Sequence, residues 1–418
     1  MSAELRHNGC DTLMLGFDYE LRRRGYAGNS CQIVLELATA IDPVHLEQRL
    51  AELARRHPIL CARPAGGFRP RWKPTGALPR VRVHERGDGL PQRLFNEPLD
   101  VRRGELVRFD LLERAVIFTW SHALMDAKSA EYFLALAGAE ELSCPEPEHD
   151  WYAERATRAG GLRARGRQAW RELERIEGFK SALPVSLATL RPARSGKMNY
   201  TVVALSGEET ARVRAHASRL CGLLGDTNFH LAVTLMALER LHRRAGCASP
   251  SHIVPVPVGL RPKGTRAPLF SNQVTMLLHQ FLPAQLDTLE HAIAAVKARH
   301  AESMRADCVD AGIALAHLFR GLPLPLYMWI VKRELHGEIC SLFFGDTGAV
   351  DPALESFLGA AIENLAHVPA VTVPPGVGVV LFRFREQLRF TVVHAEGTLS
   401  RDEASAFAAD LRASLLEP

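Results

Sequence analysis

The stretch from Arg114 to Gly138, RAVIFTWSHALMDAKSAEYFLALAG, contains the signals from which the fold is deduced. The run from Ala115 to Trp120 is short, apolar and rich in β-branched and aromatic residues, which predicts a buried strand rather than a helix. From Asp126 onward, apolar residues return at three- and four-residue steps, as in a helix that packs against a core. A strand therefore runs into a short turn at Ser121 and His122, and a helix follows from Asp126.

The turn brings one imidazole and one carboxylate close together in the sequence. The pKa of an imidazole lies near neutrality, so His122 is a candidate general base. A structural interpretation is also open, in which His122 is bonded to a backbone carbonyl and Asp126 caps the helix, a position that aspartate favours. The letters of this stretch alone favour the structural interpretation. We expect no metal here, because the sequence shows no further cluster of ligands.

The run His122-Ala-Leu-Met-Asp126-Ala127 resembles the HHxxxDG signature of the condensation-domain-like acyltransferases. This superfamily contains peptide-synthetase condensation domains, polyketide-associated acyltransferases, wax-ester synthases and chloramphenicol acetyltransferase. Further landmarks of the family follow in their usual order: a first helix with an RHP.LR-like ending at Ile41–Leu60, then Leu205–Glu209, Val258–Pro262 and Ser271–Val274. The resemblance covers nearly all 418 residues, which makes it specific although the hexamer alone is a weak signal.

Two positions depart from the signature. Ser121 stands where the family usually has its first histidine, and Ala127 stands where it has glycine. The histidine to which the family assigns catalysis is the second one, so Ser121 changes the expectation little. Glycine permits close approach of the backbone, so the extra methyl of Ala127 either narrows a passage for a thioester arm or is accommodated in the first turn of the helix.

The resemblance implies an α/β (α+β) fold made of two chloramphenicol-acetyltransferase-like lobes. Each lobe would be a mixed sheet with covering helices, and the two would form a V with a tunnel between them. We place the N-terminal lobe at residues 1–180, with His122, and the C-terminal lobe at residues 181–418, with Arg261, a closing hairpin and a closing helix. The boundary falls where the composition changes, between Cys144 and Lys197.

The resemblance also implies roles for individual residues. His122 would act as the general base, and Asp126 would form a structural salt bridge with Arg261. The alternatives for this pair are a helix cap and a surface arginine. Asn272 matches a landmark near the tunnel, so with Ser121 and Ala127 it is a possible site-lining residue.

The reaction implied is the transfer of an acyl group from a thioester to a hydroxyl or amine, in lipid or secondary-metabolite biosynthesis. The donor would be acyl-CoA or acyl-phosphopantetheine on an acyl carrier protein, and the acceptor a small-molecule alcohol or amine. We expect no permanently bound cofactor and no covalent acyl-enzyme, since the sequence has no GxSxG motif. The apolar segment from Ala311 to Val331 either lines a pocket for a fatty chain or forms a buried, kinked core helix.

Two other functions remain open. One is a non-catalytic condensation-like module that docks a carrier or partner protein through a helical region with seven arginines between Arg155 and Arg175. Such a run is more typical of a solvated helix face. The other is epimerisation, cyclisation or dehydration at the same site, which condensation-like domains also host.

Composition limits the class of protein. The length of 418 residues favours two domains, and 47% apolar with 23% charged residues is typical of a globular protein. The net charge of +4 is mild, and no zinc-finger spacing accompanies it, so nucleic acid is not an expected partner. Each lobe supplies half of the predicted tunnel, which favours a monomer.

Further patterns indicate the location of the protein and its remaining elements. Eight scattered cysteines without a CxxC pair predict reduced thiols. With no signal-like start and no apolar run of about 18 residues, we expect a cytoplasmic protein without a transmembrane segment. Asp11–Gly25 is interpreted as a lead-in segment, 310–335 as one kinked helix, and Ser341–Phe344 as a strand that turns at Gly345–Gly348.

Overall fold

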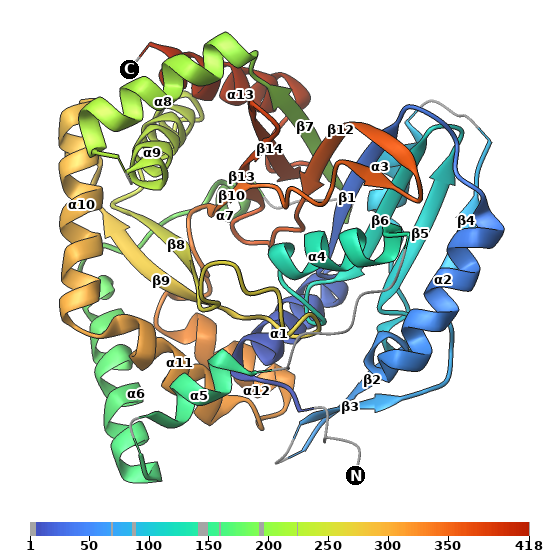
Figure 1. Ribbon diagram of the computed structural model, residues 1–418. Coiled ribbons are helices and arrows are strands. Elements are labelled where there is room, and N and C mark those ends of the chain that lie inside the picture. Colours follow the sequence, from blue (N-terminus) through green and yellow to red (C-terminus); the bar gives the residue numbers. More distant parts are fainter. Residues whose placement is uncertain are drawn as a thin grey trace.

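The computed structural model describes residues 6–67, 70–85, 89–140, 149–158, 160–191, 196–223 and 225–417. Cys144, at one end of the predicted boundary region, lies outside the described residues. Two mixed sheets with covering helices make up most of the molecule, and Figure 1 shows one at the right, beside helix α4 (Ala127–Gly138), and the other toward the top. The fold is therefore built as the sequence predicts, from two sheet-and-helix layers.

The first sheet has the strand order β11-β12-β1-β6-β5-β4. Its only parallel pair is β4–β5, and the other described pairs are antiparallel. The strands are β1 (Ser30–Leu37), β4 (Arg80–Val83), β5 (Val107–Leu112), β6 (Ala115–Ser121), β11 (Ser356–Phe357) and β12 (Ala360–Val368). Strands β11 and β12 come from the second half of the sequence, so both halves contribute to this sheet. The division of the chain at residue 180 stays a prediction.

Helices cover both faces of the first sheet. Phe118 on β6 packs against Phe133 of α4, with ring centroids 5.4 Å apart, whereas its neighbour Ile117 points to the other face and contacts Leu90 and Leu94. The covering helices are α1 (Gly9–Arg23), α2 (Pro43–Arg56), α3 (Leu90–Phe95) and α4, with a small β2 (Ala62–Ala65) and β3 (Arg71–Pro74) ribbon below. Short 3₁₀ turns lie at Pro58–Cys61 and Val101–Arg103.

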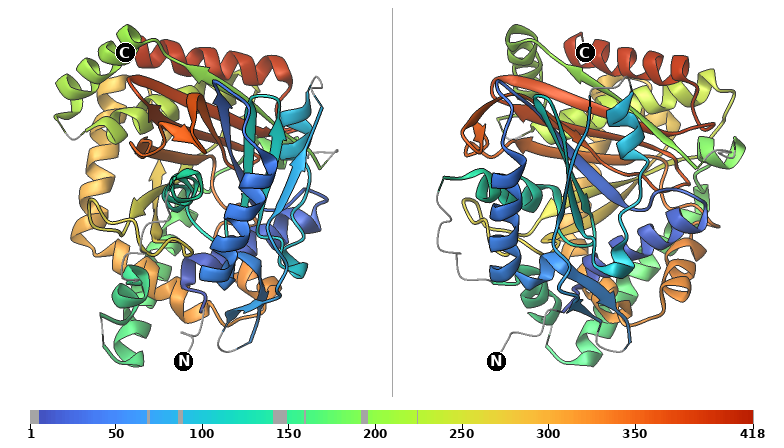
Figure 2. Two further views of the ribbon diagram at one scale, coloured as in Figure 1. Left: turned by 45° about the vertical axis from the view of Figure 1, so that its right-hand side comes forward. Right: turned by 90° about the vertical axis from the view of Figure 1, so that its right-hand side faces the viewer.

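The second sheet has the order β10-β13-β14-β7, with β10 and β13 parallel and the other pairs antiparallel. Figure 2 shows α13 lying across it. The elements are β7 (Met198–Ala204), β10 (Phe343–Ala349), β13 (Val377–Phe384), β14 (Gln387–Ala395), α8 (Gly207–Cys221), α9 (Asp226–Arg244), α10 (Leu289–Arg305) and α13 (Arg401–Leu416). The predicted closing hairpin and helix are β13, β14 and α13.

A third group of elements lies between the two sheets and below them. The ribbon of β8 (His252–Gly259) and β9 (Val274–Phe281) extends from the second sheet toward α4 (Figure 1). The remaining helices are α5 (Trp151–Arg158), α6 (Leu162–Glu177), α7 (Leu187–Leu190), α11 (Cys308–Phe319) and α12 (Leu324–Arg333), with 3₁₀ turns at Gly178–Ala182 and Pro283–Gln285.

Three local predictions are wrong. The segment interpreted as a lead-in is helix α1, and the segment 310–335 is two helices, α11 and α12, rather than one. Strand β10 does not turn at Gly345 but continues to Ala349, because it pairs with β13 along most of its length. The pairing overrides the turn signals of the glycines and Asp346.

A helix that spans a membrane must be both long and apolar. Among the described residues, no single helix meets both criteria. Helices α8 and α9 meet them only when taken together, across a bend of 98°. Apolar residues of both helices lie in the buried core beside the second sheet.

Candidate functional site

Strand β6 places His122 at the wall of a cavity between the two sheets. The strand pairs with β1 on one side and β5 on the other, and the backbone N–H of His122 donates to the carbonyl of Asn29. These bonds fix the backbone of the residue at the strand end. The cavity has a volume of about 350 Å³ and is also lined by Ala127, Lys128 and Arg261.

The imidazole of His122 is held by Asn272. Its Nδ1 lies 3.1 Å from the Oδ1 of Asn272, while the Nδ2 of the same amide donates to a carboxylate oxygen of Asp11 and to the His122 carbonyl, both at 2.9 Å. Because Nδ2 must face these acceptors, Oδ1 faces the ring and accepts a hydrogen bond from Nδ1–H. The neutral ring therefore keeps its proton on Nδ1 and leaves the lone pair of Nε2 for another partner.

Burial sets the charge of this imidazole. Removal from water lowers the pKa of His122, and this outweighs the opposing effects of its own carbonyl, of Asp126 and of Asn272. His122 is therefore neutral near pH 7, the state in which a histidine accepts a proton.

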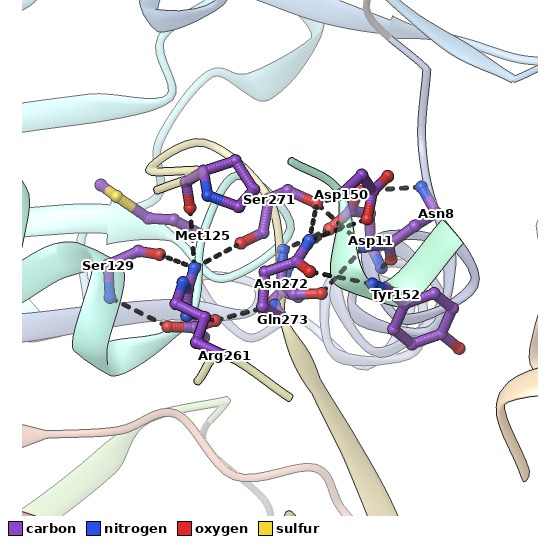
Figure 3. A network of polar contacts seen from close by, with 12 residues as sticks. Asn8, Asp11, Met125, Ser129, Asp150, Tyr152, Arg261, Ser271, Asn272 and Gln273 are labelled. Atoms are coloured by element: carbon purple, nitrogen blue, oxygen red, sulfur yellow. Dashed lines mark hydrogen bonds and ion pairs between the residues drawn. The ribbon is translucent and has the colours of Figure 1, made fainter. Parts of the chain in front are cut away.

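Asp11 anchors the far side of the Asn272 amide (Figure 3). This carboxylate, on α1, accepts hydrogen bonds from the backbone and side chain of Asn272 and from the backbone N–H of Asn8, all at 2.9 Å. Burial raises the pKa of Asp11 to about 7, against the lowering effect of these bonds. The position of His122 thus depends on a chain of contacts that begins on the first helix.

Asp126 and Arg261 form the ion pair that the resemblance predicts. Arg261 Nη1 lies 2.8 Å from Asp126 Oδ2, and each side chain is 9% exposed. Asp126 also accepts from the backbone N–H of Ser129 at 2.9 Å, so it caps α4 as well. The two interpretations of Asp126 are both correct, because one oxygen caps the helix and the other meets the arginine.

Further bonds make this pair a joint between the two halves of the chain. The backbone N–H of Gln273 donates to Asp126 at 2.8 Å, and Arg261 also donates to the carbonyl of Pro268. Arg261 further donates to the hydroxyl of Ser129 (Figure 3). Burial opposes ionisation of Asp126, but the charge of Arg261 and these backbone bonds hold its pKa below the usual value.

The three possible site-lining residues occupy different places. Ala127 lines the cavity as the first residue of α4. Ser121 does not line it, and its hydroxyl is buried without a hydrogen-bond partner in the described part of the chain. Asn272 does not line the cavity either but holds the imidazole from behind. The backbone of Ala127 is not in the left-handed region, since its φ is not positive.

Sequence reasoning missed the contribution of α1. Asp11 holds Asn272, and Met14 and Phe17 line the cavity. A signal was present, because Asn8 and Asp11 form a reciprocal capping box at the start of the helix. The pattern Asn-x-x-Asp before an apolar run was sufficient to predict a helix there.

Metal and thiol chemistry find little support in the described residues. Within them, no group of three or more histidine, cysteine, aspartate or glutamate side chains is arranged to hold a metal ion. The seven described cysteines are all free. Burial raises the pKa of Cys10 and Cys31, the two nearest in sequence to site residues, which keeps them as thiols rather than nucleophilic thiolates.

Comparison with known proteins was made by sequence and by structure. No family model and no curated protein matches the sequence. The first condensation domain of the calcium-dependent antibiotic synthetase is similar in structure, with a TM-score of 0.70 and 16% identity over 100% of this chain and 97% of that one. TRI3 trichothecene 15-O-acetyltransferase from Fusarium sporotrichioides has a TM-score of 0.69 and 12% identity, covering 98% and 94%. The epimerization domain from the third module of tyrocidine synthetase B has values of 0.64 and 12%, covering 99% and 95%.

The chain therefore has the condensation-domain fold, which chloramphenicol-acetyltransferase-like proteins share. The resemblance seen in the sequence is confirmed at the level of the fold, over the full chain. At identities of 12–16% the likeness shows the fold alone. The three similar proteins are a condensation domain, an acetyltransferase and an epimerization domain, so the fold does not by itself select the reaction.

Proposed function

We propose that the protein is an acyltransferase that moves an acyl group from a thioester to a hydroxyl or amine acceptor, with His122 as the general base. The observation that carries this proposal is the contact that holds the ring of His122 and from which its tautomer is inferred. Its Nδ1 is engaged by Asn272 at 3.1 Å, its pKa is lowered, and it lines a cavity of about 350 Å³. A neutral imidazole with a free Nε2 beside such a cavity suits proton transfer at neutral pH.

The proposed reaction needs no covalent enzyme intermediate. Nε2 of His122 takes the proton of the acceptor O–H or N–H while the acceptor atom attacks the thioester carbonyl. The tetrahedral intermediate then collapses, the carbon–sulfur bond breaks, and the leaving thiolate takes the proton back from Nε2. The products are an ester or amide and a free thiol, so His122 ends the cycle in its starting state.

In this mechanism the Asp126–Arg261 pair is structural. It ties α4 to the segment after β8, and Asn272 lies in the loop that Arg261 and Gln273 help to hold. One chain thus supplies His122 and Asp11 from the first half and Asn272 and Arg261 from the second, which is consistent with an active monomer. The free described cysteines fit a reducing compartment such as the cytoplasm.

The donor is proposed to be acyl-CoA or an acyl group on the phosphopantetheine of a carrier protein, and lipid or secondary-metabolite assembly is the proposed setting. Release of free thiol from a panel of acyl-CoA thioesters, with and without alcohol and amine acceptors, tests the transfer. Wild type should show release that acceptors stimulate. His122→Ala should lose at least about 10²-fold of it, as expected for removal of a general base.

Two controls make the test decisive. His45→Ala removes an exposed histidine on α2 and should leave the rate unchanged. In wild type, kcat/KM should fall in acid with an apparent pKa below 6.5, because burial lowers the pKa of His122 and the charged ring accepts no proton. Equal rates for wild type and His122→Ala, with CoA and carrier-protein donors alike, would remove His122 from the mechanism.

The alternative of a non-catalytic docking module keeps one supporting observation. Arg163, Arg167 and Arg171 are exposed on α6, and none of them forms an ion pair with a described acidic residue. If the double variant Arg163→Glu/Arg167→Glu abolishes the biological output while His122→Ala leaves it intact, the protein is a docking module and the proposed catalysis is wrong. Product mass separates simple transfer from epimerisation, cyclisation or dehydration at the same site.

A further inference from the structure

A second cavity adjoins the one that His122 lines. It has a volume of about 170 Å³ and lies between α1, α6, β9, α11 and α12. Phe17, Val274, Met276 and Phe343 line both cavities. The rings of Phe17 and Phe343 meet edge to face with centroids 5.7 Å apart, so two aromatic side chains stand where the cavities meet. The second cavity therefore shares a wall with the first, and the two aromatic rings are part of that wall.

The lining of this second cavity is almost entirely hydrocarbon. Leu315, Ala316 and Phe319 of α11 and Ile330 of α12 contribute apolar side chains. Its two carboxylates are already neutralised, Glu172 by Arg175 and Glu334 by Lys180, with the oxygens 2.5 Å from the cations in both pairs. An apolar cavity of this kind attracts apolar groups rather than water.

We propose that this apolar cavity receives the unbranched alkyl chain of a substrate while the reacting end of that substrate lies at His122. The inference rests on the proposed acyl transfer and adds the class of substrate: a long-chain acyl donor or a long-chain alcohol or amine. To enter, such a chain would have to part the edge-to-face contact of Phe17 and Phe343, and it would then lie against α11 and β9. Each methylene that enters should strengthen binding about fourfold, until the cavity is full.

Gly312 offers a clean way to shorten the cavity. It lines the cavity on α11, and a Cβ added there would meet only Thr275 Oγ1 at 3.7 Å and the Met276 carbonyl at 3.9 Å, which are ordinary contacts. Gly312→Ala should therefore be tolerated, and alanine is the better helix former. Gly312→Leu extends the side chain into the cavity and should exclude the end of a long chain.

The experiment measures binding without turnover. Saturated fatty acids of increasing length displace a fluorescent fatty-acid probe from wild type, Gly312→Ala and Gly312→Leu. We expect affinity to rise with chain length in wild type and Gly312→Ala, and to stop rising at a shorter chain in Gly312→Leu. Phe319→Ala, which enlarges the cavity, should move the limit in the opposite direction, so the test survives if Gly312→Leu fails to fold. Chain-length profiles that coincide in all four proteins overturn the inference.

Turnover then identifies which substrate carries the chain. One series varies the acyl-CoA donor with a short alcohol, and the other varies the alcohol with acetyl-CoA. If Gly312→Leu shortens the preferred chain length in the donor series, the acyl donor carries the chain. If it does so in the alcohol series, the acceptor carries the chain. Failure of the proposed function has a different signature: His122→Ala and wild type would turn over no thioester, yet both would still bind chains with the length limit that Gly312 sets.

Discussion

Arg261 Nη1 donates to Asp126 Oδ2 across 2.8 Å, and this contact joins the segment after β8 to the helix that follows His122. The two residues are 135 positions apart in the sequence. Both are buried, and Asp126 uses its other oxygen to cap α4. The pair therefore sets the relative position of the strand end with His122 and the loop with Asn272, which must meet for the imidazole to be held.

Removing the arginine should destabilise the protein strongly. In Arg261→Met the carboxylate of Asp126 remains buried without its cation, and loss of one partner of a buried pair costs about 3–5 kcal/mol. Urea-induced unfolding measures the loss. Arg299→Met is the matched control, because Arg299 pairs with Glu302 at an exposed site on α10, where such pairs contribute less than about 1 kcal/mol. Equal losses in the two variants would contradict a structural role for the Arg261 pair.

Asp11 should make stability depend on pH. Burial raises the pKa of Asp11 to about 7 in the folded protein, whereas an unfolded aspartate has a pKa of about 3.9. Between these values the folded state holds a proton that the unfolded state has released, so stability falls as pH rises, by up to about 1.4 kcal/mol per pH unit. Above the folded pKa the effect is constant.

Asp11→Asn isolates this contribution because asparagine does not titrate. The free energy of unfolding of wild type minus that of the variant should decrease from pH 5 to pH 7 and then level off. Urea unfolding at pH 5, 6, 7 and 8 gives this difference. A difference that is constant over the series, or that increases with pH, would show that the carboxyl of Asp11 is ionised throughout.

Local signals were sufficient for much of the fold. The strand predicted at Ala115–Trp120 is β6, which extends one residue further, and the helix after Asp126 was likewise predicted from short-range pattern. Helix α1 was missed although its capping box is visible in the sequence, and its burial, which includes the polar Asp18 and Glu20, was not predicted. Strand β12 joins the first sheet from the far end of the sequence, and no local pattern reveals such a pairing.

The site was predictable in its parts and not in its assembly. His122, Asp126 and Arg261 followed from the signature and its landmarks, and the structure brings them to one cavity. The contact of Asn272 with His122 spans 150 positions, and the support from Asp11 spans 261. Such contacts depend on the docking of α1 against the second half of the chain, which sequence periodicity does not encode.

Asn272 should affect the rate more than binding. In Asn272→Ala the Nδ1 of His122 loses its acceptor, so the ring no longer prefers the tautomer with a free Nε2. We expect kcat to fall about 10²-fold with little change in KM, since Asn272 acts through His122 rather than on the substrate. Steady-state kinetics with an acyl-CoA donor separates the two constants.

Asn96→Ala is the control for loss of a hydrogen-bonded amide. Asn96 bonds with the backbone of Met198 in both directions and does not line the cavity of His122, so its removal should lower stability and leave kcat unchanged. If Asn272→Ala raises KM and spares kcat, Asn272 contacts the substrate and does not orient the base.

Ala127 should control access of the donor, because it lines the cavity at the start of α4 where the family has glycine. Ala127→Val places two further methyl groups there and should lower kcat/KM for acyl-CoA at least about tenfold, a typical effect of added bulk in a pocket. Ala127→Gly should raise kcat/KM, at a cost of about 1 kcal/mol in helix stability.

Ala215→Val, at an exposed site on α8, introduces the same β-branched residue into a helix and should leave kcat/KM unchanged. Unchanged kcat/KM in both Ala127 variants would mean that the methyl group is accommodated in the first turn of the helix and that the thioester arm passes elsewhere.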